Sequence, residues 1–166
     1  MTEIRNSVLA GIAFGLLFGI FLAIRFDPFY ALIAGPLCGL AFGLAMYFFV
    51  TSKTVKKQTQ IQMAEGEVIV HLGSANHFLN GEAVGGKLYL LNDKLQFQSH
   101  GFNRQNHRLV IKLNQIQKIS FFKSLGLIPN GIAISTTAGR TEKFVVNNRR
   151  LWKNKIETVK QKAFKI

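Results

Sequence analysis

The sequence predicts an N-terminal membrane hairpin of two α-helices, followed by a mainly β domain that a C-terminal helix closes. Three observations lead to this fold class. Two uncharged apolar runs stand close together within the first 50 residues. From residue 65 onward, apolar and polar residues alternate with the period of a β-strand. After residue 147 the apolar residues recur at three and four positions, which is the period of an α-helix.

The two apolar runs have the length of membrane spans. Residues 8–24 and residues 29–50 contain no charge, and a helix needs roughly 20 apolar residues to cross the hydrocarbon core. The first run lacks the small-residue cleavage site of a signal peptide, and a second run follows it at once. The alternative is a soluble helical hairpin, which is disfavoured because a soluble helix is rarely apolar on all faces.

Glycine recurs at every fourth position in both runs, at Gly11, Gly15 and Gly19 and again at Gly35, Gly39 and Gly43. Such a row lies along one side of a helix and lets another backbone approach closely. Reversing the chain at Asp27 aligns the two rows, which favours packing of one row on the other within a single chain. Packing against a second copy is the alternative. The only cysteine, Cys38, lies in the second run, so no intrachain disulfide can form.

Charges at the ends of the runs predict the orientation. Lys53, Lys56 and Lys57 directly follow the second run, whereas Arg25 and Asp27 cancel in the turn. Lysine and arginine near the ends of spans are retained on the cytoplasmic side. The sequence therefore predicts a multi-pass protein of the cell membrane with both termini in the cytoplasm.

The formal net charge of +13 belongs wholly to the part of the chain after residue 50, because residues 1–50 contain two basic and two acidic side chains. A basic domain held near a membrane faces the anionic lipids of the cytoplasmic leaflet. Nucleic acid is the other polyanion that such a charge could bind. It is not an expected partner, because the predicted strands lack an exposed row of aromatic side chains.

We divide the chain into the hairpin at 1–50, a polar linker at 51–63 and a domain at 64–166. Within the domain, seven short strands separated by turns are typical of a barrel or a sandwich. They are predicted at 67–72, 87–91, 94–99, 108–113, 116–123, 132–134 and 141–146.

A helix is predicted after Asn147 or Asn148, either of which can cap it. Its apolar stripe consists of Trp152, Ile156, Val159 and Ala163. The favoured interpretation is that this stripe closes an open end of the barrel. The alternative is an amphipathic helix that lies on the bilayer.

The loop 125–129 is unusually apolar, with the sequence Leu-Gly-Leu-Ile-Pro. We favour the interpretation that it plugs one end of the barrel, because exposed apolar loops reduce solubility. The alternative is that it dips into the bilayer interface beside Lys123.

Several segments of the domain together resemble a known family, the GRAM domain of bacterial type. They are Gly85–Phe97, Phe102–His107, Leu109–Leu113 with Ile116, Ile128–Gly131, Gly139–Arg140 and Lys143–Val146, followed by Arg149 and Trp152. The resemblance covers residues 64–160. It implies a pleckstrin-homology-like (PH-like) fold, which is a partly open seven-stranded antiparallel barrel capped by a C-terminal helix. It also implies binding of lipid headgroups or proteins at membranes, without catalysis.

Many phosphoinositide-binding members of the wider PH group carry clustered lysine and arginine in the first hairpin loop. Here that loop is interpreted as residues 73–85, which contain neither residue type. An anionic headgroup is therefore expected to contact basic residues elsewhere, although each of them could also be an ordinary solvated charge. The candidates are Lys53, Lys56, Lys57, Arg104, Arg108, Lys112, Lys118, Lys123, Arg149 and Arg150.

The sequence carries little that is typical of an enzyme. It has no phosphate-binding loop and no nucleophile elbow, and its eight acidic residues are too few and too scattered for general acid–base work. The four histidines, His71, His77, His100 and His107, lack cysteine or acidic partners at metal-ligand spacing and are interpreted as polar loop positions. We therefore predict no catalytic residues, no cofactor and no metal.

The function predicted from these features is that of a membrane adaptor. The hairpin anchors a binding module that contacts anionic lipid or a protein partner at the same leaflet. The alternative is a self-associating scaffold in which the glycine rows drive assembly of a homo-oligomer.

Overall fold

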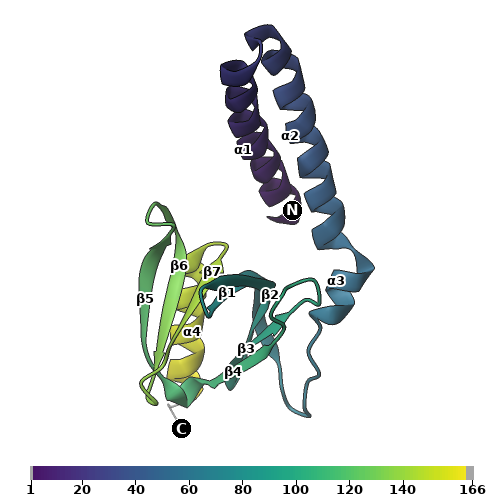
Figure 1. The fold of residues 1–166 in the computed structure, drawn as a ribbon. Helices are drawn as coiled ribbons and strands as arrows, with labels where there is room; N and C mark the ends of the chain where they lie inside the picture. The colour runs from purple at the N-terminus through teal and green to yellow at the C-terminus, as the bar shows by residue number, and fades with distance from the viewer. Residues whose placement is uncertain (1, 164–166) are drawn as a thin grey trace. The chain divides into compact units, whose positions relative to one another are not determined.

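The computed structural model describes residues 2–163. The chain forms two compact units, with the division between Lys57 and Gln58. The first unit contains the antiparallel helices α1 (Thr2–Arg25) and α2 (Pro28–Thr51), and the short helix α3 (Lys53–Gln58) begins at its end (Figure 1).

The reversal between α1 and α2 is set by Asp27. Its Oδ1 accepts hydrogen bonds from the backbone N–H groups of Phe29 at 2.9 Å and Tyr30 at 3.1 Å, which satisfies donors at the start of α2. Pro28 takes the first helical position, where a missing N–H has no consequence. Only Phe26 and Asp27 lie between the two helices.

Both helices are long and apolar enough to cross a membrane, over Glu3–Arg25 and Pro28–Thr51. Within the apolar window of 18 residues in each helix, only 22% and 11%, respectively, is buried within the molecule. A core helix of a soluble domain would instead bury most of its apolar surface.

The second unit contains one antiparallel sheet of seven strands in the order β4-β3-β2-β1-β7-β6-β5, which confirms the predicted fold class. The sheet curves into a half-barrel (Figure 1). Its strands are β1 (Ile69–Leu79), β2 (Glu82–Leu91), β3 (Lys94–Ser99), β4 (Arg108–Lys112), β5 (Ile116–Ser124), β6 (Ile128–Thr136) and β7 (Thr141–Val146).

The first hairpin differs from the prediction. Residues 73–79 and 82–85, expected in a loop, belong to β1 and β2, with Asn76 opposite Gly85. Only Asn80 and Gly81 form the turn, at φ angles of 51° and 83°. Asn-Gly is the preferred pair for a turn with two positive φ angles. The prediction of a longer loop overlooked this dipeptide, which signals a two-residue turn.

Helix α4 (Arg149–Ala163) closes the half-barrel, as predicted. Trp152, Ile156 and Val159 are buried in the same core as Phe97 and Phe144. The fourth residue of the predicted stripe, Ala163, is exposed. Asn148 provides the cap, since its Oδ1 accepts from the backbone N–H of Leu151 at 3.2 Å.

The interpretation of the loop 125–129 as a barrel plug is wrong. The side chains of Leu125 and Leu127 are 87% and 81% exposed, respectively, and Ile128 is exposed as well. The core is already filled by side chains of the strands and of α4, so the loop has no cavity to enter.

Candidate functional site

The predicted anion-binding residues lie on several elements of the two units. Lys53, Lys56 and Lys57 are on α3 and belong to the first unit. In the second unit, Arg108 and Lys112 are on β4, one edge strand of the sheet, and Lys118 is on β5, the other edge strand. Within the second unit, Lys118 is therefore separated from Arg108 and Lys112 by the width of the sheet.

Two of the dispersed arginines have polar partners. Arg104, in the connection between β3 and β4, has Nη1 3.6 Å from Glu82 Oε1. Arg108 donates from Nη2 to Gln96 Oε1 at 3.3 Å. The first contact is exposed, and an exposed ion pair contributes little to stability. The second reaches a buried side chain, since Gln96 is 1% exposed.

Three of the candidates are brought together at the end of β5. Arg149 starts α4, and its Nη1 donates to the backbone oxygen of Phe122 at 2.9 Å. Its guanidinium carbon lies 4.7 Å from the centroid of the Phe121 ring. Arg150 follows in the same helix, and Lys123 follows Phe122 in β5. The hydrogen bond from Arg149 therefore joins two segments that are 27 residues apart.

Two further lysines contact the phenylalanines at the end of β5. Lys153 Nζ lies 5.4 Å from the centroid of the Phe121 ring, and Lys143 Nζ lies 5.9 Å from that of the Phe122 ring. Both are cation–π contacts. Sequence reasoning missed these two residues, because β7 and α4 bring them to β5 only in the folded domain. Phe121 and Phe122 are neighbours in β5, so their side chains point to opposite faces of the sheet, and Lys143 lies on the face opposite to Arg149 and Lys153. We call the group Lys123, Arg149, Arg150 and Lys153 the basic collar.

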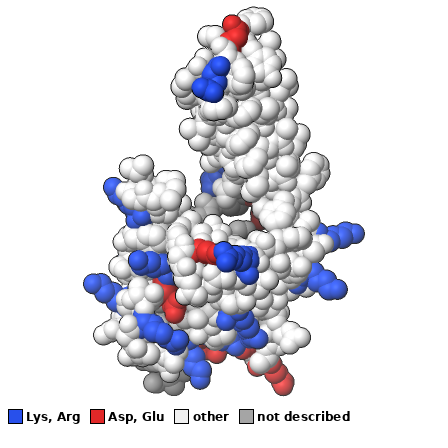
Figure 2. All heavy atoms as spheres, viewed as in Figure 1, with Lys and Arg blue, Asp and Glu red and all other residues white. Residues whose placement is uncertain are grey.

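The collar is little neutralised. Lys153 Nζ lies 3.7 Å from Glu157 Oε1, whereas no ion pair within residues 2–163 involves Lys123, Arg149 or Arg150. Figure 2 shows that blue lysine and arginine side chains outnumber the red acidic ones on the visible face.

A hollow of about 410 Å³ lies beside the collar, lined by Pro129, Asn130 and residues 146–150. Its described lining contains no acidic side chain. Arg149 and Arg150 occupy the first turn of α4, where the positive end of the helix dipole disfavours basic residues. An anion in the hollow would compensate both the arginine charges and the dipole.

A second polar group is buried inside the barrel. The side chain of His77 on β1 is 2% exposed, so its interpretation as a loop residue is wrong. Its Nε2 lies 3.0 Å from Glu142 Oε2, and its Nδ1 lies 2.8 Å from His107 Nε2. A carboxylate only accepts, so His77 Nε2 donates to Glu142 and His77 Nδ1 accepts from His107 Nε2.

This arrangement favours two neutral histidines. Burial lowers the pKa of His77, and the bond to Glu142 only partly offsets that effect. Burial also lowers the pKa of His107, whose remaining ring nitrogen is buried without a described partner. No group of three potential ligands in residues 2–163 is arranged to hold a metal ion. The pair and Glu142 therefore serve as a buried polar network among the rings of Phe97 and Phe144, in which each ring nitrogen of His77 has a partner.

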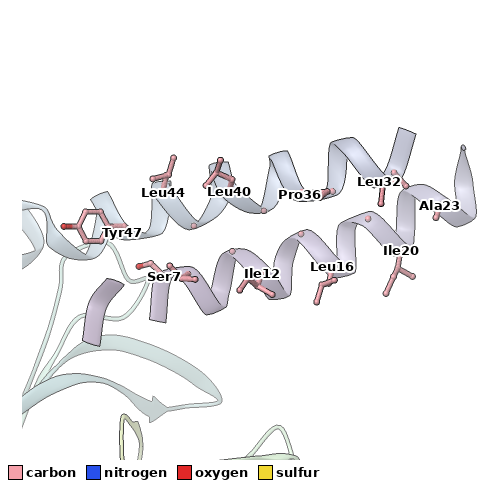
Figure 3. Close-up of a pocket in the computed structure, with 18 of the residues that line it drawn as sticks. Ser7, Ile12, Leu16, Ile20, Ala23, Leu32, Pro36, Leu40, Leu44 and Tyr47 are labelled. Carbon is pink, nitrogen blue, oxygen red and sulfur yellow. The ribbon is translucent and has the colours of Figure 1, made fainter. Parts of the chain in front are cut away.

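The glycine rows of α1 and α2 face each other. A Cβ built on Gly15 would lie 2.9 Å from the backbone oxygen of Gly35, and one on Gly11 would lie 2.6 Å from that of Gly39. An apolar groove of about 890 Å³ follows these glycines. Leu40 on α2 and Leu16 on α1 lie on the outer sides of the helices that border it (Figure 3).

Comparison with known proteins places the second unit in a family. The family model of the GRAM domain matches residues 55–150. Among solved structures, the C-terminal domain of an unknown protein from Leishmania infantum has a TM-score of 0.51 at 18% identity, covering 58% of this chain and 86% of that chain. The Vps36 N-terminal PH domain has a TM-score of 0.51 at 13% identity, covering 68% of this chain and 92% of that chain.

At these identities the two solved structures establish the PH-like fold alone. No curated protein matches this chain in sequence. The family match extends from α3 to the second residue of α4 and includes all seven strands. The chain belongs to the GRAM domain family.

Proposed function

We propose that the chain is a membrane-anchored, non-catalytic binding module that presents its GRAM domain to anionic lipid headgroups at the cytoplasmic leaflet. Helices α1 and α2 supply an anchor with two spans, and both chain termini are cytoplasmic. The GRAM and PH-like fold, which often binds lipids or proteins, supports the class of function.

The observation that carries this proposal is the basic collar beside a hollow that has no acidic lining residue. Lipid phosphates and carboxylates are recognised best by arginine, whose planar guanidinium can donate two parallel hydrogen bonds. Each basic group near an anionic leaflet adds roughly 1 kcal/mol of attraction. The four such groups of the collar, beside the end of β5, give the domain a preferred face for a negatively charged surface.

The collar is also preorganised. Phe121 and the backbone oxygen of Phe122 hold the Arg149 side chain in place, so little conformational entropy is lost when an anion binds. The anchor adds a second advantage, because a tethered domain meets its membrane at high effective concentration. Modest affinity for a headgroup is then sufficient for occupancy.

The test is purification of the intact protein in mild detergent, with identification of the lipids and proteins that accompany it. Anionic lipids should be enriched over zwitterionic ones relative to the source membrane. Arg150→Glu should reduce this enrichment, whereas Lys112→Glu should not, although both substitutions change the net charge equally. Lys112 is exposed on β4, away from the collar.

Three outcomes would count against the proposal. Absence of anionic lipid enrichment in the unmodified protein would remove the lipid function. A protein recovered in stoichiometric amount in place of lipid would identify a protein ligand. Equal losses in the two variants would assign lipid binding to net charge rather than to the collar.

A further inference from the structure

The turn between β5 and β6 exposes the two most exposed large apolar side chains found in residues 2–163. Leu125 is 87% and Leu127 is 81% exposed. These exposed fractions exceed that of every described large apolar side chain on α1 and α2, the two helices long enough to span a membrane. At the place of this turn, Figure 2 shows an uncharged projection with basic side chains at its base. Such exposure needs an explanation, because nothing in the domain packs on these leucines.

The backbone of the turn makes the choice of leucine more unusual. Leu125 and Gly126 have φ angles of 51° and 74°, and the backbone N–H of Leu127 donates to the oxygen of Ser124 at 3.1 Å. Two consecutive positive φ angles favour Asn-Gly. The other strand turn of this kind in the domain has that pair, at Asn80 and Gly81. A bulky residue at positive φ is a genuine outlier, and outliers of this kind point to function.

The turn therefore holds a strained leucine that contributes no packing to the fold. Both the conformation and the exposure disfavour leucine at this position, so a benefit outside the folded domain is needed to explain it. The benefit must come from an apolar environment that the tip of the hairpin can reach.

The basic collar lies at the base of the same hairpin. Lys123 precedes the turn by two residues, and Arg149 bonds to the preceding residue, Phe122. Along the hairpin, the order is thus apolar tip, then cationic base. An anionic bilayer has the matching order, with hydrocarbon beneath negatively charged headgroups.

We propose that the tip formed by Leu125–Leu127 inserts into the interfacial layer of an anionic bilayer while the basic collar contacts the headgroups around it. This inference rests on the proposed function and adds to it a depth and an orientation of the domain. A protein groove could also receive two leucines, and that case is an outcome of the test. The membrane is the better match because a convex apolar tip with cationic residues at its base suits a broad anionic surface.

The test uses the full chain in proteoliposomes of phosphatidylcholine, with or without phosphatidylserine. The substitution Cys38→Ala removes the native cysteine, and Leu127→Cys introduces a single new one at the tip. This new cysteine carries a polarity-sensitive fluorophore. Quencher-labelled lipid acyl chains should quench this fluorophore in vesicles that contain phosphatidylserine. A fluorophore on Ala138→Cys, in the exposed turn between β6 and β7, serves as the matched control and should remain unquenched.

Two substitutions then separate insertion from folding. Leu125→Asn and Leu125→Gly both suit a positive φ, so the hairpin should retain its structure. Each removes one leucine from the interface and should lower the ratio of inserted to free tip by about tenfold. The same loss in both variants, with an unchanged circular dichroism spectrum, supports insertion.

An unquenched tip fluorophore, or equal quenching with and without Leu125, would overturn the inference. If anionic lipids are nevertheless enriched on purification, the proposed function stands and only insertion fails. A quenched tip without lipid enrichment would instead overturn headgroup binding and leave insertion in place.

Discussion

Leu125 and Asn80 hold comparable positions in two turns of one sheet, and their difference defines a prediction at the scale of single residues. Leu125→Asn should stabilise the domain by about 1 kcal/mol, because asparagine tolerates a positive φ that leucine does not. Chemical denaturation of the full chain in detergent measures this change. The converse substitution, Asn80→Leu, should destabilise the domain, and it also removes the bond from Asn80 to Gln105. A loss of stability in Leu125→Asn would show that Leu125 supports the fold.

The buried histidines give the domain a pH dependence. The folded-state pKa values of His71, His77, His100 and His107 are all lowered, chiefly by burial, from an ordinary value of 6.5. Their contribution to stability is therefore complete above that pH and is lost as pH falls toward the folded-state values. The free energy of unfolding should decline as pH is lowered from about 7.5 to about 5.5.

The variant His107→Gln tests whether the pair formed by His77 and His107 causes this pH dependence of stability. Glutamine still donates a hydrogen bond to His77 but cannot gain a proton, so the decline with pH should become shallower. Denaturation of both proteins across the same pH range makes the comparison. Parallel curves would show that the pair formed by His77 and His107 does not determine the acid sensitivity.

At the scale of elements, the glycine rows offer a test with an internal control. A Cβ on Gly39 would lie 2.7 Å from the backbone oxygen of Gly11 and 2.9 Å from the Cα of Gly15, so Gly39→Ala must move the helices apart. Such overpacking costs about 1–3 kcal/mol. A Cβ on Gly19 would have no contact shorter than 3.6 Å. Gly19→Ala should therefore be tolerated.

Thermal unfolding of the two variants in detergent compares these effects, and chemical crosslinking reports on assembly. Equal melting temperatures would contradict close packing of α1 on α2. A loss of oligomer in Gly39→Ala with no loss of stability would instead assign the rows to contacts between copies, which is the scaffold interpretation.

The elements also show what a single sequence can predict. The alternation of apolar and polar residues predicted β3 correctly, because Leu95 and Phe97 are both buried. It failed in the middle of β1, where Gly73, Ser74, Ala75 and Asn76 have no large apolar side chains to alternate. That segment is a strand because β2 pairs with all of it and β7 pairs with it from Ala75 onward, which is a property of the folded sheet.

At the scale of the whole molecule, composition predicted the two parts, because their charge and hydropathy differ so strongly. The basic collar could not be predicted in full, since β5 and α4 both contribute to it. Only the fold brings Lys143 and Lys153 to the phenylalanines of β5. The exposure of Leu125 could not be predicted from the sequence either, because an apolar loop is compatible both with a plug of the barrel and with a projecting tip.

The central claim is that a two-span anchor holds the GRAM domain on the cytoplasmic side of the cell membrane. The most direct measurement is labelling with a membrane-impermeant maleimide in a Cys38→Ala background, with one new cysteine at Phe26 or at Ala138. The account predicts that Phe26→Cys is labelled in intact cells and that Ala138→Cys is labelled only after the membrane is permeabilised. Labelling of Ala138→Cys in intact cells, or recovery of the protein in the soluble fraction, would contradict it.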